Sequence, residues 1–475
     1  MTSLYQDTIV APATIPGTGA ISIIRVSGPK AFSIVDSVVQ LNHGTISEAE
    51  AYTIHYGSVL LNGTLLDQVL VSVFRAPHSY TGEDSVEIST HASSYIVQEL
   101  TGLLLDAGAR MAEPGEFTRR AFLNGKMDLA QAEAVADVIS STNAASHRVA
   151  MNQLKGSFSA QLDKLRDQLL EMASLLELEL DFSEEEVEFA QRDKLLDLVQ
   201  KCLSHVERLA ASFHQGNMIK NGVPVALVGA VNAGKSSLLN ALLGEERAIV
   251  SNVAGTTRDT IEEILQIEGL AFRFIDTAGI RESQDEIEQL GIERTYRKTQ
   301  SAEVVLGVLD SSNALSELLP RAKQICGMVN PASQTLILLL NKADLLSKDD
   351  INKYVTTVNE FVSSIDSKAI IIPCSAKTGL GLETLKNALF QTQKELLTTD
   401  SGTLVTNLRH YQSLTSCAQA LRRTAEALQA ALPTDLVAED LRAAIASVNL
   451  ITGQDLGLSP EAVLHTIFSR HCIGK

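Results

Sequence analysis

The chain has 475 residues, which at roughly 150 residues per domain leaves room for about three domains. Its 45% hydrophobic and 20% charged residues are typical of a globular protein and exclude global disorder. The formal net charge of −18 at pH 7 repels nucleic acid and anionic membranes at long range. Any contact with a polyanion must therefore be local.

The cysteines favour a reducing compartment. There are five, an odd number, and they are scattered without a CxxC pair or a Cys/His cluster. The N-terminus shows no basic stretch leading into an apolar run, so we expect no signal peptide. The longest apolar stretches, such as Thr335–Leu340, have the length of a strand. We therefore expect a cytoplasmic protein.

Residues 1–118 alternate short β-rich runs with Gly, Pro and Asn turn signals. A helix is expected at Ser94–Ala107, and strands are expected at Ala20–Val26, Ala51–Leu61, Val69–Phe74 and Ser85–Ser89. This pattern predicts an α+β domain with a small mixed or antiparallel sheet.

The rest of the chain consists of two helical stretches on either side of a segment in which expected strands and helices alternate. Residues 119–222 and 391–475 carry apolar side chains at steps of three and four, which predicts long amphipathic helices. Residues 223–390 alternate buried-strand runs with helical segments, which predicts a doubly wound, mostly parallel sheet. We infer that the flanking stretches form one discontinuous all-α domain into which the α/β domain is inserted.

The inserted segment opens with a phosphate-binding motif. The strand PVALVG runs into a loop from Gly229 to Gly234, followed by Lys235 and Ser236, in the pattern G-x-x-x-x-G-K-[ST]. Loop N–H groups can converge on phosphate oxygens, Lys235 supplies a cation, and the Ser236 hydroxyl can bind Mg²⁺.

Three further motifs follow, each at the end of an expected strand. Asp276-Thr-Ala-Gly279 places a carboxylate near the metal and an N–H near the γ-phosphate. In Asn341-Lys-Ala-Asp344, the carboxylate can accept from the N1–H and exocyclic amine of guanine, a donor pair that adenine lacks. Ser375-Ala-Lys377 can close over the base. This order of motifs predicts a P-loop GTPase.

The predicted GTP-binding residues come from these motifs and from the loop between the first two: Asn232, Ala233, Gly234, Lys235, Ser236, Ser237, Ser251, Asn252, Val253, Ala254, Gly255, Thr256, Thr257, Asp276, Thr277, Ala278, Gly279, Asn341, Lys342, Asp344, Ser375, Ala376 and Lys377.

The residue after Gly279 leaves a gap in the hydrolytic machinery. Ras-like enzymes have a Gln there that orients the attacking water, whereas this chain has Ile280. Thr257 can provide a second Mg²⁺ ligand from the loop Ser251–Asp259. Arg258 and Arg281 could equally be solvated residues or ion-pair partners, so no arginine finger is evident.

The motifs GxxNAGKSSLLNAL, GTTRD and DTAG together resemble the Era-like GTPases, a branch with a hydrophobic residue after DxxG. PGEFTRRAFLNGKMDLAQAEAVADVI and the terminal HCIGK are similar to the MnmE (TrmE) family of tRNA-modification GTPases over essentially the whole chain. The resemblance implies a tetrahydrofolate-binding-like N-terminal domain, a discontinuous helical domain, an inserted GTPase domain and a homodimer formed through the N-terminal domains.

The resemblance also implies a potassium ion in place of an arginine finger. Carried over by motif, Asn232, Ser251, Val253 and Thr256 would hold it. Many members of the family have Thr at the position of Ser251. The serine keeps the hydroxyl group, so we expect potassium binding to survive. Glu288 matches the family's glutamate that orients the catalytic water, so the predicted catalytic residues are Glu288, Lys235 and Thr257.

For folate, the resemblance implies binding of 5-formyltetrahydrofolate or of the methylene form as one-carbon donor. The matching positions are Arg25, Glu87, Lys126 and the terminal Lys475. Without the resemblance, these residues read as ordinary surface ion pairs. Cys472 is a possible functional thiol, which we do not assign as a nucleophile.

The predicted function is therefore GTP hydrolysis in tRNA modification. With the FAD-containing partner MnmG (GidA), the family adds an aminomethyl or carboxymethylaminomethyl group to C5 of the wobble uridine. The alternative is an Era-like regulatory switch in ribosome assembly. Such proteins usually add a basic RNA-binding module after the GTPase domain, whereas this chain continues with acidic-to-neutral helices.

Overall fold

The structure is a computed structural model that describes residues 7–181, 192–244, 263–275, 299–398 and 404–454, with Phe468 and Gly474. Its contacts divide the chain into two compact units. The first comprises Met1–Ser140, Ala150–Glu207 and Gln412–Lys475, and the second comprises Ser141–Val149 and Arg208–Tyr411. Among the described residues, none of the helices combines the length and the apolarity needed to cross a membrane.

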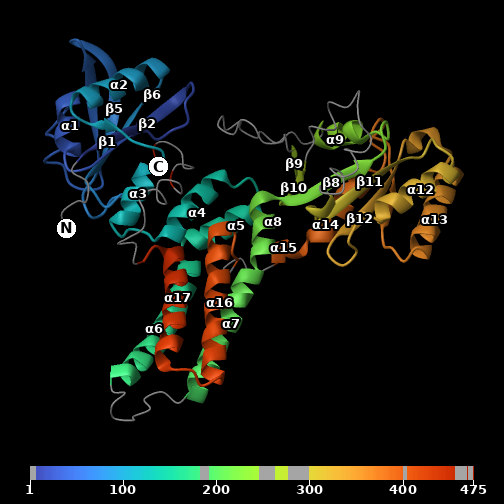
Figure 1. Ribbon diagram of the computed structural model, residues 1–475. Helices are drawn as coiled ribbons and strands as arrows, with labels where there is room; N and C mark the ends of the chain where they lie inside the picture. The colour runs from blue at the N-terminus through green and yellow to red at the C-terminus, as the bar shows by residue number, and fades with distance from the viewer. Residues whose placement is uncertain are drawn as a thin grey trace. The chain divides into compact units, whose positions relative to one another are not determined.

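The first unit begins with an α+β domain, as the sequence predicts (Figure 1). Its sheet has the strand order β3-β4-β5-β6-β2-β1-β7, and neighbouring strands are antiparallel except β1 and β7. The strands are β1 (Ile9–Pro12), β2 (Gly19–Ser27), β3 (Val39–Leu41), β4 (Thr53–Leu61), β5 (Thr64–Phe74), β6 (Ser85–Ala92) and β7 (Arg110–Met111).

Helices α1 (Ala31–Val38) and α2 (Ser94–Asp106) cover one face of this sheet. The alternation along β5 explains the arrangement, because Val69, Val71 and Val73 point into one core with Leu100 and Leu104 of α2. Intervening side chains of β5 are more exposed. The opposite face therefore presents the side chains that alternate with this core, among them those of β2 and β6 discussed below.

The helical part of the first unit joins segments from both flanks of the GTPase segment. The helices are α3 (Glu116–Leu123), α4 (Leu129–Ser140), α6 (Ser157–Asp181), α7 (Arg192–Ala211), α16 (Leu408–Gln429) and α17 (Thr434–Thr452). The last turn of α7 and the first turn of α16 are assigned to the second unit. Arg442 of α17 pairs with Glu177 of α6 at 2.9 Å, and Arg422 of α16 pairs with Glu207 of α7 at 2.6 Å. Figure 1 shows these four helices side by side. The predicted packing of the two flanks on each other is confirmed.

The second unit contains the predicted doubly wound sheet. Its order is β13-β12-β11-β8-β10-β9, with β9 antiparallel at the edge. The strands are β8 (Val223–Gly229), β9 (Glu263–Ile267), β10 (Leu270–Phe274), β11 (Val304–Asp310), β12 (Thr335–Asn341) and β13 (Ile370–Pro373).

Helices pack on both faces of this sheet (Figure 1). Helices α9 (Lys235–Gly244) and α14 (Leu382–Gln393) contribute to one core, and α12 (Leu315–Cys326) and α13 (Lys348–Ser364) contribute to the other. Further helices of this unit are α8 (Phe213–Asn221), α15 (Glu395–Thr398) and the first half of α5 (Ala144–Leu154). The predicted domain boundaries 1–118, 119–222, 223–390 and 391–475 stay predictions.

Candidate active site

The phosphate-binding loop lies between β8 and α9, in the strand-loop-helix context that the motif requires. Asn232 and Gly234 both have positive φ, of 64° and 92°. A left-handed conformation favours glycine and is tolerated by asparagine, so the loop turns where the sequence permits it. The loop ends at the N-terminus of α9, where backbone N–H groups and the helix dipole favour an anion.

The two motif glycines are fixed by close contacts. A Cβ at Gly229 would overlap the carbonyl oxygen of Val308 on β11, and a Cβ at Gly234 would overlap Nδ2 of Asn341. Both contacts are far inside van der Waals distance, so neither position accommodates a larger residue without a shift of the sheet or of Asn341. The loop is therefore seated against β11 and the end of β12.

Lys235 spans the phosphate-binding loop. Its Nζ donates to the carbonyl oxygens of Gly229 and Ala230, each at 2.8 Å. Burial lowers the pKa of Lys235, because the charged ammonium is partly removed from water. An anionic phosphate at the loop would favour the charged form again. The residue is thus a partly desolvated cation at the place where phosphate charge is expected.

Asn341 connects the base-recognition motifs to the phosphate-binding loop. Its Nδ2 donates to the carbonyl of Ala233 at 2.8 Å, and its Oδ1 accepts from the N–H of Ala376 at 3.2 Å. The side chain is 2% exposed, so these bonds form in a dry environment where they fix geometry strongly. The structure therefore brings together three motifs that are far apart in the sequence, with the exposed Asp344 and Lys377 beside them.

A residue that the motif search did not include completes this part of the site. Asp310, the last residue of β11, accepts from Nζ of Lys342 at 2.6 Å and from both the N–H and the hydroxyl of Ser312. Burial raises the pKa of Asp310, but these hydrogen bonds outweigh it and the pKa lies below its ordinary value. The pair therefore stabilises the fold at neutral pH and is lost only as the pH falls through the lowered pKa.

We expect Asp310→Ala to weaken guanine-nucleotide binding about tenfold, because Lys342, a predicted nucleotide-binding residue, loses the partner that fixes its ammonium group, and a charge-assisted hydrogen bond is worth about 1.5–3 kcal/mol. The measurement is a fluorescence titration with a labelled GDP. Ser312→Ala is the control, since it removes only one hydroxyl from Asp310 and should leave the affinity within about twofold. Equal affinities for wild type and Asp310→Ala would exclude this role.

Part of the predicted nucleotide site lies outside the described residues. This applies to the loop Ser251–Asp259 with Thr257, to the motif Asp276–Gly279 and to Glu288, and equally to Cys472 and Lys475. Their predicted roles stay predictions. Ser236 and Ser237, by contrast, are placed as the second and third residues of α9, directly after Lys235.

The predicted folate residues Arg25 and Glu87 face each other on β2 and β6, which pair at this register. Arg25 donates to Oε1 of Glu87 at 2.8 Å from Nη2 and to the carbonyl of Gly474 at 3.2 Å from Nη1. Its guanidinium lies 5.2 Å from the ring centroid of Tyr80 and 5.6 Å from that of Phe117. The structure therefore gathers a cation, a carboxylate, two aromatic rings and the backbone carbonyl of Gly474 at one place.

A buried ionic network supports this place from α3. Arg120 is fully buried and donates to Glu116 at 2.9 Å and to Glu83 at 3.3 Å. Burial raises the pKa of Glu116, yet hydrogen bonds from Arg110 and Arg120 outweigh it and hold the pKa below its ordinary value. The same helix carries Phe117, and the network therefore fixes the ring that lies beside Arg25.

Lys126, the fourth predicted folate position with Lys475, lies on the loop after α3. Its Nζ donates to the carbonyl of Pro77 at 2.9 Å, and its stem lies beside Gly82. No contact joins it to Arg25 or Glu87 among the described residues. Tyr80 and Phe117 were missed by the sequence reasoning, because only the paired strands and the position of α3 bring them to Arg25.

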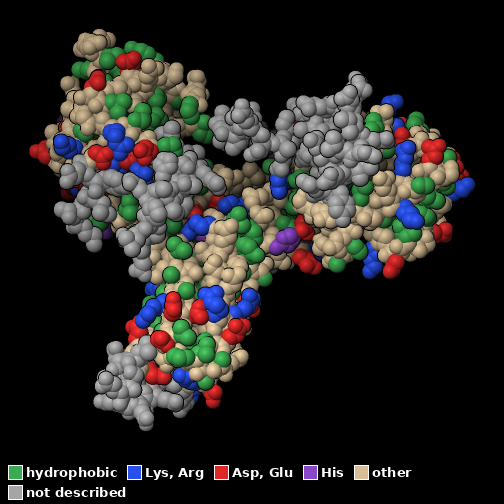
Figure 2. Space-filling model, in the orientation of Figure 1, with side chains coloured by type: hydrophobic (Ala, Val, Ile, Leu, Met, Phe, Trp, Pro, Cys, Tyr) green, Lys and Arg blue, Asp and Glu red, His purple; other side chains and the backbone are tan. Residues whose placement is uncertain are grey.

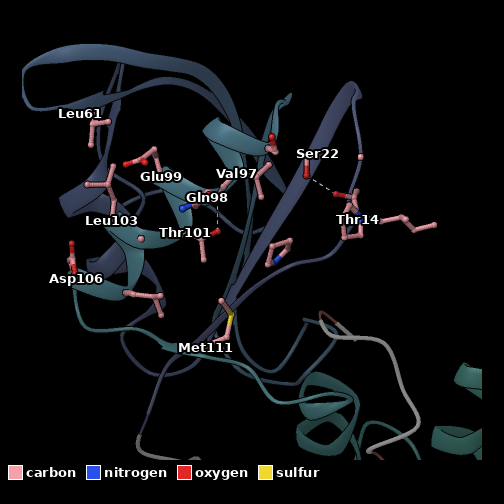
Figure 3. Close-up of a pocket in the computed structure, with 17 residues that line it drawn as sticks. Thr14, Ser22, Leu61, Val97, Gln98, Glu99, Thr101, Leu103, Asp106 and Met111 are labelled. Atoms are coloured by element: carbon pink, nitrogen blue, oxygen red, sulfur yellow. Dashed lines mark hydrogen bonds between the residues drawn. The ribbon is translucent and has the colours of Figure 1, made fainter. Parts of the chain in front are cut away.

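A separate cavity of about 650 Å³ opens beside α2 (Figure 3). Its wall combines apolar side chains such as Val97 and Met111 with the Thr14–Ser22 hydroxyl pair, which is joined at 2.6 Å. The described residues that line it include Glu99 and Asp106 but not Arg25, Glu87 or Lys126. Because this lining adds carboxylates and no cation, it disfavours the anionic tail of a folate.

The charge of the surface agrees with the sequence. On the face drawn in Figure 2, basic and acidic side chains alternate over the described parts of both units, and the basic ones do not gather into one broad patch. The ion pairs Arg442–Glu177 and Arg422–Glu207 illustrate this mixture.

Comparisons with known proteins cover the whole chain. The family description "MnmE helical domain" matches residues 129–472, and "GTP-binding protein TrmE N-terminus" matches residues 8–126. A protein of Flavobacterium johnsoniae named tRNA modification GTPase MnmE is 48% identical over 476 residues, which cover 99% of this chain and 100% of the relative. A relative with the same name from Bacteroides fragilis is 48% identical, and the alignment covers 99% of this chain and 100% of the relative. Another from Christiangramia forsetii is 49% identical, and the alignment covers 99% of both chains.

Solved structures are matched over shorter stretches. The FeoB G-domain from Methanococcus jannaschii is 27% identical, with a TM-score of 0.26, and the match covers 36% of this chain and 98% of that one.

Proposed function

Since this chain belongs to the MnmE family, we propose that it is a GTPase that hydrolyses GTP to GDP and phosphate in the course of modifying tRNA. The observation that carries the proposal is the bridge made by Asn341, which ties the phosphate-binding loop to the guanine-recognition motifs. Full-length relatives at 48% identity bear the name tRNA modification GTPase.

The described residues have part of the chemistry that GTP hydrolysis requires. Lys235 offers a partly desolvated cation to the β- and γ-phosphates, and Asp344 offers a carboxylate to the donor edge of guanine. Ser236, at the start of α9, presents a hydroxyl of the kind that Mg²⁺ prefers, and Thr257 would add the second. When bound, the magnesium ion would neutralise phosphate charge; Glu288 would orient the attacking water.

Potassium is proposed as the second cation of the site. Asn232 fits this role, because it is an exposed residue in the left-handed conformation at the outer turn of the phosphate-binding loop. The remaining proposed ligands are Ser251, Val253 and Thr256, which supply oxygen atoms only. A potassium ion there would add positive charge near the phosphates, where Ile280 offers no hydrogen bond and no arginine finger is evident.

Folate is proposed to bind at Arg25, Glu87, Lys126 and Lys475. The rings of Tyr80 and Phe117, which both lie beside Arg25, support this, because a pterin is a flat, polar heterocycle and Glu87 can accept from its ring N–H groups. In the structure Glu87 forms an ion pair with Arg25. A ligand that binds Glu87 would therefore either share this carboxylate with Arg25 or displace Arg25 from it. The one-carbon unit would come from 5-formyl- or methylenetetrahydrofolate.

We expect the double variant Arg25→Ala/Glu87→Ala to lose at least about tenfold in affinity for 5-formyltetrahydrofolate, since each charge-assisted hydrogen bond is worth about 1.5–3 kcal/mol. Isothermal titration calorimetry on the full-length protein measures this. Arg422→Ala/Glu207→Ala is the matched control, because it removes an exposed ion pair of the same unit far along the chain. Wild-type affinity in the first variant would mean that the folate pocket lies elsewhere.

The remaining proposals concern assembly and substrate. We propose a homodimer formed through the N-terminal domains, a complex with the FAD-containing protein MnmG (GidA), and a cytoplasmic location. The product would be an aminomethyl or carboxymethylaminomethyl group at C5 of the wobble uridine of certain tRNAs. Because the charge of −18 disfavours tRNA, we propose that the partner provides much of the basic surface.

Reconstitution tests this proposal. Unmodified tRNA is incubated with the full-length protein, MnmG, GTP, a folate donor and KCl, and the nucleosides are analysed by mass spectrometry. The modified uridine should form in the complete mixture and disappear when this protein or GTP is omitted. Formation of the product without this protein would contradict the proposal, and GTP-dependent binding to ribosomal subunits would favour the alternative of a ribosome-assembly switch.

A further inference from the structure

Tyr52, the residue directly before β4, has an unusual backbone conformation. Its φ is 62°, in the left-handed region that an aromatic residue rarely adopts, because the Cβ crowds the backbone there. The residue is 66% exposed, so burial of the ring does not offset the cost of this conformation. A strained residue persists where its contacts hold it in place, and such residues cluster at functional sites.

Three contacts hold Tyr52 against the end of β5 and the loop that follows. The N–H of Tyr52 donates to the carbonyl of Val73 at 2.8 Å, one residue before the end of β5. Its ring meets that of Phe74 edge-on, with 6.1 Å between the ring centroids. Its hydroxyl donates to the carbonyl of His78 at 2.9 Å. Tyr52 therefore extends from the start of β4 to the loop after β5.

This loop, which we call the β5–β6 loop, consists of residues 75–84 and connects β5 to β6. Side chains from outside the loop hold its backbone. Three of its carbonyl groups accept such hydrogen bonds: Pro77 from Lys126 at 2.9 Å, His78 from Tyr52 at 2.9 Å and Thr81 from Asn124 at 2.8 Å. Two of these donors follow α3 and the third precedes β4. The loop is therefore attached to two separate elements of the domain.

The β5–β6 loop carries Tyr80, which lies at the proposed folate site. The ring centroid of Tyr80 is 5.2 Å from the guanidinium of Arg25. The hydroxyl of Tyr80 forms a hydrogen bond of 2.8 Å with that of Thr118 on α3. In the sequence, Tyr80 stands between His78 and Thr81, whose carbonyl groups are both held from outside. The position of the ring beside Arg25 therefore depends on the conformation of the loop.

We propose that Tyr52 is a positioning residue for the site at Arg25 and Glu87. Its hydroxyl holds the β5–β6 loop in the conformation that places the ring of Tyr80 beside Arg25, so this wall of the site is formed before a ligand binds. Binding then avoids the loss of conformational entropy that ordering the loop would cost. The positioning of the loop does not depend on a ligand; its effect on folate rests on the proposed function.

Hydrogen exchange of the ligand-free, full-length protein tests the positioning. Tyr52→Phe keeps the ring and removes only the hydroxyl that donates to His78, so the variant should fold as the wild type does. Peptides that span residues 75–84 should exchange about fivefold faster in Tyr52→Phe than in the wild type, because one hydrogen bond between uncharged groups is lost. Equal exchange of these peptides in the two proteins would overturn the proposal.

Tyr56→Phe is the matched control. Tyr56 lies on β4, is 44% exposed, and its hydroxyl has no hydrogen-bond partner among the residues that the structure describes. The substitution therefore removes the same atom from a neighbouring tyrosine without releasing the β5–β6 loop. It should leave the exchange of residues 75–84 within about twofold of the wild type.

Folate binding shows whether Tyr52 acts through Tyr80. In isothermal titration calorimetry with 5-formyltetrahydrofolate, Tyr52→Phe should bind about fivefold more weakly than the wild type, and Tyr56→Phe should stay within about twofold. In a Tyr80→Leu background, Tyr52→Phe should have no further effect, because the ring that the loop positions is missing. A residue that only stabilises the fold would weaken binding by the same factor in both backgrounds, and that result would overturn the proposal.

The two measurements separate this proposal from the proposed folate site. If the wild type does not bind 5-formyltetrahydrofolate but Tyr52→Phe still speeds exchange of the loop, folate binding is refuted and the positioning of the loop is supported. If the wild type binds 5-formyltetrahydrofolate and Tyr52→Phe binds it equally well, the role of Tyr52 is refuted and the folate site remains.

Discussion

Lys235→Ala is expected to lower the rate of GTP hydrolysis by about a hundredfold to a thousandfold, the range found when one preorganised charge stabiliser is removed. The physical reason is that Lys235 is held across the phosphate-binding loop by two carbonyl oxygens, both at 2.8 Å, and is partly desolvated. Its charge therefore acts on the phosphates with little screening by water. Phosphate release under saturating GTP measures the effect.

Lys353→Ala is the control for Lys235→Ala. Lys353 is an exposed lysine of α13 and its removal should leave turnover within about twofold. The variants should also have similar melting temperatures, because the loop carbonyls released from Lys235 are open to water when the lysine is removed. Turnover of Lys235→Ala within about threefold of wild type would show that the phosphates bind elsewhere.

Asp344→Asn is expected to change the base preference of the site from guanine to xanthine. The Asp344 carboxylate would accept from the N1–H and the exocyclic amine of guanine, and an asparagine amide would instead donate to the C2 carbonyl that xanthine carries. A site built to hydrogen-bond one base rejects the mismatched one strongly, so kcat/KM for GTP should fall by at least about a hundredfold. The measurement is kcat/KM for GTP and for xanthosine triphosphate with both proteins.

Asp349→Asn provides the matched comparison, because it makes the same change at an exposed aspartate of the first turn of α13. It should keep the preference of the wild type for GTP. If Asp344→Asn hydrolyses GTP as well as before and gains nothing with xanthosine triphosphate, Asp344 does not contact the base.

The sequence predicts the GTPase core well, because its strands are continuous apolar runs of strand length that end in polar motifs. The edge strand β9 has no such run and went unnoticed, as did the short elements β1, β3, β7 and α1. β7 has only two residues and exists because it pairs with β1. Such elements depend on tertiary pairing, which local periodicity does not encode.

The site residues also fall into two groups: those that sequence motifs predict and those whose contacts depend on tertiary structure. The motifs predict the neighbourhood of Asn341, Lys235 and Ser375, and Asp310 could have been found because it also ends a buried strand. The pairing of Arg25 with Glu87 depends on the register of β2 against β6, and the rings beside them depend on α3. The division of α5 between two units was equally hidden, because Ala145 and Val149 fit the apolar period of a helix whichever core they enter.

Analysis of tRNA from living cells tests the central claim, that GTP hydrolysis by this protein serves tRNA modification, most directly. Cells lacking the gene are complemented with the wild type, with Lys235→Ala or with an empty vector, and the wobble uridines are analysed by mass spectrometry. We predict that the C5 aminomethyl-type group returns with the wild type and stays absent with Lys235→Ala and the empty vector. Wobble uridines that are modified alike in all three strains would contradict the claim.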